Sequence, residues 1–165
     1  MLADALLIID LQNGVCHQKD QSIDHLEQLV LTVNSLIHNY SGRPIIFIQH
    51  CDEELVEGTF AWEVIPEIHT EKGTHFVNKI HANSFYQTNL QELLTQLTIT
   101  SLEVCGAQTQ YCVDTTVKFA HGLGYQLQMR KSASTTYDTP VMSAETLIRF
   151  YEDIWDGRFL KLYEE

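Results

Sequence analysis

The residue whose setting most clearly suggests chemistry is Cys112. The apolar run 101–105 predicts a buried strand that breaks at Gly106, and Cys112 then lies at or near the start of a helical pattern (Val113, Val117, Ala120, Leu123). A thiol there faces the positive end of the helix dipole and free backbone N–H groups, which favour the reactive thiolate. Strand, turn, cysteine and helix therefore predict a nucleophile, although a buried structural cysteine is the commoner role for such a residue taken alone.

Other reactive groups follow the predicted strands at corresponding places. Asp10 ends the first strand, His50-Cys51-Asp52 follow the second, and Lys79 lies near the end of the third. Ligands of open parallel sheets bind outside the carboxyl ends of the strands, so these groups and Cys112 are expected along one rim. A carboxylate that takes a proton, an ammonium that stabilises a thiolate and a thiol that attacks are the parts that a cysteine nucleophile needs.

The elements that must position these groups alternate between strands and helices. Continuous apolar strands separated by amphipathic helices predict an α/β fold of one domain (1–165), a doubly wound, mainly parallel six-stranded sheet with helices on both faces, a three-layer Rossmann-like architecture. The expected strands are 5–9, 45–48, 75–80, 101–105, 125–130 and 158–163, and the expected helices are 23–37, a helix marked by 90–97, one after Cys112, and 143–154 with Ser143 as its cap.

Composition limits the possible partners. The net charge of −12 and only 10 Lys and Arg in 165 residues disfavour binding to nucleic acid. The start of the chain does not resemble a signal peptide, and no apolar run reaches the roughly 18 residues of a membrane span. The four cysteines have no CxxC spacing, so we expect a reducing cytoplasm and no membrane partner.

Three separated segments together resemble the isochorismatase-like cysteine hydrolases, a family that includes nicotinamidases and other small-amide hydrolases. The segments are 5–13 (ALLIIDLQN), 77–85 (VNKIHANSF) and 105–113 (CGAQTQYCV), and they occur in the family's order. The resemblance implies that Cys112 is the nucleophile, Asp10 the general base and Lys79 the cation that holds the thiolate. It also implies a cis peptide between Ala107 and Gln108, so that the N–H groups of Gln108 and Cys112 form an oxyanion hole.

Further roles are expected around this triad. Phe85 and Tyr111, which flank the catalytic segments, are candidate pocket residues together with Gln12 and His50. The pair Gly14-Val15 departs from the family pattern and is expected to open space beside Asp10. His50-Cys51-Asp52 reverses the order of the nicotinamidase metal ligands, so we expect no metal and no cofactor, and nicotinamidase activity is not the first choice. The resemblance alone implies a homo-oligomer, a dimer or tetramer.

The favoured function is hydrolysis of a small amide or related C–N bond through a thioester. The retained Cys112 argues against the vinyl-ether hydrolysis of true isochorismatases, which lack this cysteine. An alternative is a non-hydrolytic small-molecule binder or thiol sensor on the same scaffold. A flavodoxin-like nucleotide module is weakly supported, because the chain has no phosphate-binding loop.

Overall fold

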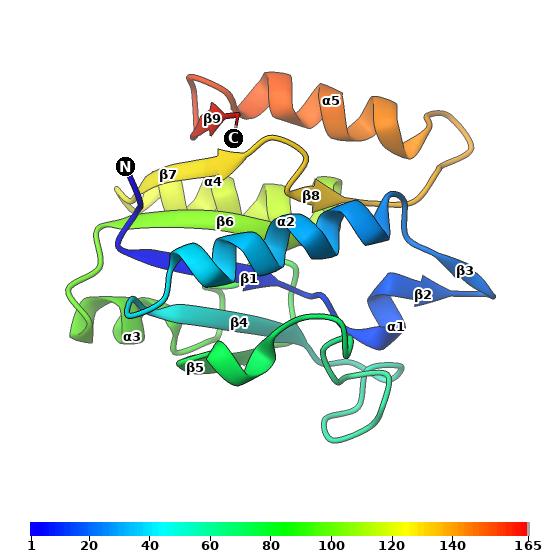
Figure 1. Cartoon of the computed structure of the whole chain (residues 1–165), viewed down its shortest axis with the longest axis horizontal. Coiled ribbons are helices and arrows are strands. Elements are labelled where there is room, and N and C mark those ends of the chain that lie inside the picture. Colours follow the sequence, from blue (N-terminus) through cyan, green and yellow to red (C-terminus); the bar gives the residue numbers. More distant parts are fainter. Residues whose placement is uncertain (165) are drawn as a thin grey trace.

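A computed structural model describes residues 1–164 and shows a central parallel sheet (Figure 1). Its strand order is β5-β4-β1-β6-β7-β9, and the neighbouring strands along this path pair in parallel. The six strands are β1 (Ala5–Ile9), β4 (Ile45–His50), β5 (His75–Lys79), β6 (Ser101–Ala107), β7 (Gln126–Arg130) and β9 (Lys161–Tyr163). The predicted six-stranded α/β sheet is therefore confirmed, with the two-residue β8 (Ser134–Thr135) added beside the end of β6.

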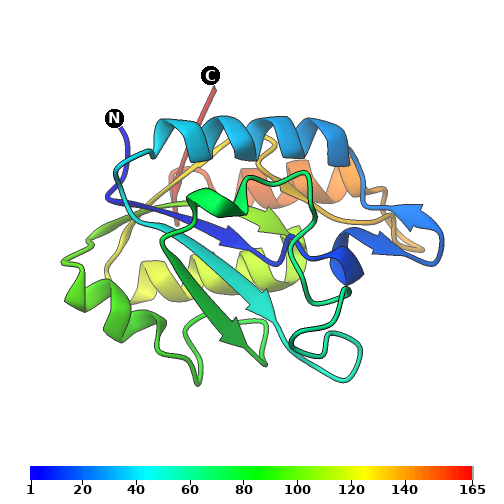
Figure 2. The ribbon, with the colours of Figure 1, turned by 60° about the horizontal axis from the view of Figure 1, so that its bottom comes forward.

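Helices cover both faces of this sheet. Helix α2 lies on one side, and α3 and α4 lie on the other, whereas α5 lies beyond β7 near β9 (Figures 1 and 2). Their bounds are α2 (Leu26–Asn39), α3 (Leu90–Gln96), α4 (Asp114–Gly122) and α5 (Ala144–Trp155). The connection from β4 to β5 contains the 3₁₀ turn η1 (Thr70–Lys72), which lies on the α2 side of the sheet (Figure 2).

The apolar periodicity explains where these elements form. All five residues of β1 are buried, as expected for a central strand covered on both faces. Ser143 caps α5 as predicted, because its side chain accepts a hydrogen bond from the Thr146 N–H at 3.2 Å. No helix among residues 1–164 is long and apolar enough to cross a bilayer.

Several short elements had no clear signal in the sequence. They are the one-turn α1 (Asn13–Cys16), the antiparallel ribbon of β2 (His17–Gln18) and β3 (Gln21–Ser22), and the π-helical turn η2 (Thr109–Val113). The turn η2 runs directly into α4, so Cys112 lies two residues before the regular helix begins at Asp114. The predicted place of the thiol, between a buried strand and a helix, is correct in outline.

Candidate active site

Three parallel strand ends position the reactive side chains. The register pairs His50 at the end of β4 with Lys79 at the end of β5. Asp10 follows β1 directly, and its N–H donates to the Ile48 carbonyl at 3.0 Å. Its backbone has φ 51°, a left-handed conformation that Asp tolerates better than most residues and that turns the chain out of the strand. The expected rim of strand ends is thus present.

The ammonium of Lys79 is the centre of the cluster. Its Nζ lies 2.8 Å from Asp10 Oδ2, 3.0 Å from His50 Nδ1 and 3.3 Å from Cys112 Sγ. Lys79 and Asp10 are 1% and 2% exposed, so this ion pair is removed from water. The three donor hydrogens of the ammonium can therefore be shared among a carboxylate, an imidazole and a sulfur.

The backbone path from β6 to Cys112 depends on a glycine and on a cis peptide bond. Gly106 has φ +130°, and a Cβ there would lie 2.1 Å from the Ile9 carbonyl oxygen, so only glycine lets β6 pass β1 this closely. The next peptide bond but one, Ala107–Gln108, is cis, as the resemblance implies. The turn η2 then carries Cys112 to the ammonium of Lys79.

The protonation state of Cys112 differs from the sequence-based expectation. Burial, followed by the Asp10 carboxylate, raises the pKa of the Cys112 thiol to about 12, and the nearby Lys79 offsets this only in part. Burial and Asp10 therefore oppose the thiolate that the helix start was expected to favour. The local turn carries no sign of this effect, because the carboxylate comes from another strand. These surroundings favour a neutral thiol beside the ion pair of Asp10 and Lys79.

His50, which the sequence places among the candidate pocket residues, also contacts the ammonium of Lys79. Its Nδ1 faces Lys79 Nζ, and its Nε2 lies 3.4 Å from Asp52 Oδ2. Burial and the charge of Lys79 lower the pKa of His50 below 6.5, so the neutral ring can accept a hydrogen bond from the ammonium. Neither the strand pattern nor the family resemblance predicts this contact.

A metal ion would compete with Lys79 for its partners. One ligand atom from each of Asp10, His50 and Cys112 lies within 4.8 Å of the others, a spacing that could suit a metal. The ammonium already contacts all three side chains, so an ion would have to displace it. Asp52 meanwhile accepts hydrogen bonds from the N–H groups of Glu54 and Leu55. These residues do not fit a nicotinamidase-like metal centre.

The remaining predicted pocket residues are not equivalent. Tyr111 is 56% exposed beside the nucleophile, where a substrate could contact it. Gln12 is fully buried, because its amide donates to the carbonyls of His50 and Trp62 and accepts from the His50 N–H. Gln12 therefore fastens the loop to the end of β4, and its two amide ends are already hydrogen-bonded within the protein.

Phe85 and Gly14, for which open space was expected, both lie in packed surroundings. Phe85 is 6% exposed, and its ring packs against Phe119 and Tyr125, which is a core environment. The space expected at Gly14 is filled, since a Cβ there would lie 2.6 Å from Leu55 Cδ2. The idea that Gly14 opens room beside Asp10 is wrong, because the loop after β4 folds back onto this position.

The fold and this cluster define an α/β protein with an aspartate, a lysine and a cysteine gathered at its strand ends, and comparison with known proteins gives the family. Residues 4–147 match the isochorismatase domain, so the chain belongs to the isochorismatase domain family. A crystal structure titled as an isochorismatase family protein is 41% identical, with a TM-score of 0.93 and coverage of 96% of each chain.

Curated relatives agree with this assignment. The uncharacterized isochorismatase family protein YddQ of Bacillus subtilis is 30% identical over 147 residues, which is 82% of this chain and 79% of YddQ. Nicotinamidase 3 of Arabidopsis thaliana is 26% identical over 157 residues, covering 85% of this chain and 77% of the plant protein. The chain is therefore similar to hydrolases of its family across most of its length.

Proposed function

We propose that this protein is a cysteine hydrolase that cleaves a small amide or related C–N bond through a thioester. The observation that carries the proposal is the position of Lys79 Nζ, 2.8 Å from Asp10 Oδ2 and 3.3 Å from Cys112 Sγ. Similarity to a protein named Nicotinamidase 3 supports amide chemistry.

In the proposed mechanism, the neutral thiol and the ionised carboxylate are the correct starting states. As the Cys112 sulfur adds to the substrate carbonyl carbon, its proton passes to the carboxylate of Asp10, which lies 2.8 Å from Lys79 Nζ. The ammonium at 3.3 Å stabilises the negative charge that develops on sulfur. The raised thiol pKa is thus compatible with catalysis, because deprotonation occurs during attack.

The second half of the reaction uses the same groups. The N–H groups of Gln108 and Cys112 are proposed to hold the oxyanion, and Asp10 returns its proton to the leaving nitrogen as the C–N bond breaks. Water then attacks the thioester while Asp10 accepts its proton. The C–S bond breaks as Asp10 returns that proton to the Cys112 sulfur, and the acid product leaves. Each proton that Asp10 takes up is returned within the cycle.

The thiol-sensor alternative receives less support from the site. Redox-sensing cysteines have a low pKa and are accessible, because the thiolate reacts with oxidants. Burial and Asp10 instead raise the pKa of Cys112 to about 12. A homo-oligomer and a cytoplasmic location stay predictions.

The test is a panel of small amides, ureides and carbamoyl compounds assayed for ammonia release. With a substrate in hand, Cys112→Ala should abolish turnover, and rapid quenching of the wild type should trap an acyl group on the peptide containing Cys112. The matched control is Cys51→Ala, a partly exposed cysteine on the neighbouring loop that should retain activity. Turnover by Cys112→Ala at the wild-type rate, or an acyl group on another residue, would refute the proposal.

A further inference from the structure

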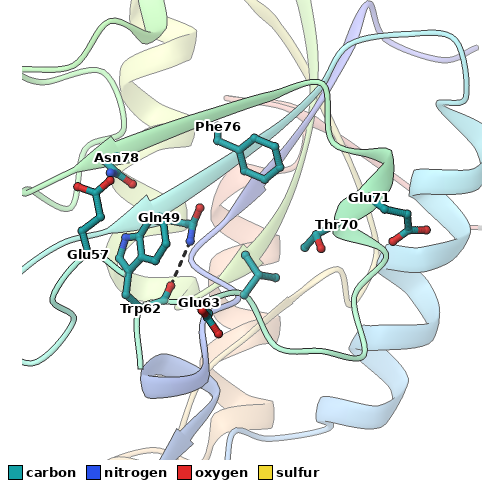
Figure 3. A pocket seen from close by; sticks show the side chains of 9 residues that line it. Gln49, Glu57, Trp62, Glu63, Thr70, Glu71, Phe76 and Asn78 are labelled. Atoms are coloured by element: carbon teal, nitrogen blue, oxygen red, sulfur yellow. Dashed lines mark hydrogen bonds between the residues drawn. The ribbon is translucent and has the colours of Figure 1, made fainter. Parts of the chain in front are cut away.

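A second cleft lies on the opposite face of the strands that carry His50 and Lys79. Side chains alternate between the faces of a strand, so Gln49 and Asn78, which precede these two residues and pair with each other in register, point away from the triad. The loop after β4 and the turn η1 wall this cleft of about 590 Å³ (Figure 3). Its size lies within the usual range for small-molecule sites.

The lining combines negative charge with aromatic surface. Three glutamates, Glu57, Glu63 and Glu71, border the cleft, and no lysine, arginine or histidine lines it. Trp62 and Phe76 lie between them (Figure 3), and Phe76 is 55% exposed while its ring stacks on Phe47. Carboxylates beside exposed π-faces attract organic cations through charge and through the ring quadrupole.

The amide of Gln49 supplies a hydrogen-bond acceptor on the cleft floor. Gln49 is only 4% exposed, and its nitrogen donates to the Trp62 carbonyl at 3.1 Å. Its oxygen lies between the Trp62 and Phe76 side chains (Figure 3) and accepts no hydrogen bond from residues 1–164. The rest of this side chain is buried, but its oxygen reaches the surface of the cleft, where an N–H group of a ligand would satisfy it.

We propose that this cleft binds a small organic cation, a guanidinium or primary ammonium group attached to an apolar body. The cationic group would donate to the Gln49 oxygen and face the glutamates, while the apolar part covers Trp62 and Phe76. A second copy of the chain is a poor occupant, since it would bring another net charge of −12 towards the same carboxylates. The proposal does not depend on the hydrolase activity.

Butylguanidinium and its neutral counterpart butylurea provide a direct test with the whole protein. The chain has two tryptophans, and Trp155 is fully buried, so saturable quenching by butylguanidinium should come from Trp62 and disappear in Trp62→Phe. Calorimetry should still detect the cation in that variant. The side-chain amide signals of Gln49 should shift on titration with the cation and stay in place with butylurea.

Matched variants separate a built site from general attraction to an acidic protein. Glu57→Gln, Glu63→Gln and Glu71→Gln combined should weaken the binding of butylguanidinium about fivefold or more, because three charges that line the cleft are lost together. The control combines Glu27→Gln, Glu53→Gln and Glu92→Gln, which are exposed glutamates outside the cleft, and should change affinity by less than about twofold. Equal binding of butylurea, equal loss in both triple variants, or no saturable binding would overturn the proposal.

Discussion

Breaking the buried ion pair between Lys79 and Asp10 should lower the free energy of unfolding by a measurable amount. Lys79→Met removes the cation from a carboxylate that is 2% exposed and whose Oδ1 already has no hydrogen-bond partner among residues 1–164. An unpaired buried charge typically costs 3–5 kcal/mol, so we expect the free energy of unfolding at pH 7 to fall by about 3–5 kcal/mol. Asp10→Asn should cost about as much, since it leaves the ammonium without its carboxylate.

A double variant measures the interaction energy between Lys79 and Asp10. In Lys79→Met with Asp10→Asn both charges are gone, so its loss should be smaller than the sum of the single losses by about 2–3 kcal/mol. Urea unfolding followed by circular dichroism at pH 7 measures all four proteins. The difference in free energy of unfolding between the wild type and Lys79→Met should also become smaller as the pH is lowered, because a protonated carboxyl group costs less to bury than a carboxylate.

Two results would refute this reasoning. One is a loss below about 1 kcal/mol for Lys79→Met, which would mean that the carboxylate is solvated or paired in another way. The other is additivity, in which the double variant loses the full sum of the two single variants. Cys112→Ala is the matched control, because it removes a neutral thiol from the same cluster and should leave the ion pair in place.

Three further predictions concern the same region. Iodoacetamide should alkylate wild-type Cys112 slowly at pH 7, because the raised pKa of about 12 keeps the thiol protonated. Asp10→Asn should be alkylated faster although it loses turnover, since the substitution removes a charge that raises this pKa. Equal alkylation rates would contradict this role of Asp10. The lowered pKa of His50 means that its contribution to stability is present above pH 6.5 and is lost as the pH falls below it, so unfolding at pH 5 and pH 8 should differ less in His50→Gln than in the wild type. Gly106→Ala should destabilise the protein by more than about 3 kcal/mol in a thermal or urea melt, because the added Cβ meets the Ile9 carbonyl oxygen; a variant that melts like the wild type would show that β6 can move.

The sequence predicts the parts of the site that depend on strand order and side-chain type. Apolar runs locate the strands, and the strand-end rule then brings Asp10, Lys79 and Cys112 together, as the structure shows. Ser143 could be assigned as a cap because its partner is three residues away in the chain. Such features are local, or follow from topology alone.

The parts that could not be predicted depend on contacts between distant segments. The charge state of Cys112 depends on burial and on Asp10, whose distance from the sulfur is set only by the folded chain. The contact between His50 and Lys79 depends on the pairing of β4 with β5 and on the directions of two side chains, which only the folded chain brings together. The hydrogen bonds of Gln12 arise because the irregular loop returns to β1, and irregular loops carry little periodic signal.

The carbonyl of Trp62 has a wider consequence than its place in a loop suggests. It accepts a hydrogen bond from Gln12 on the triad side at 2.9 Å. It accepts another at 3.1 Å from Gln49, on the floor of the cleft lined by Trp62 and Phe76. The loop therefore cannot withdraw from one side without releasing a buried amide on the other. Insertions or deletions that reshape this segment during divergence of the family would alter both surfaces at once, so new ligands on either side are expected to evolve as linked changes.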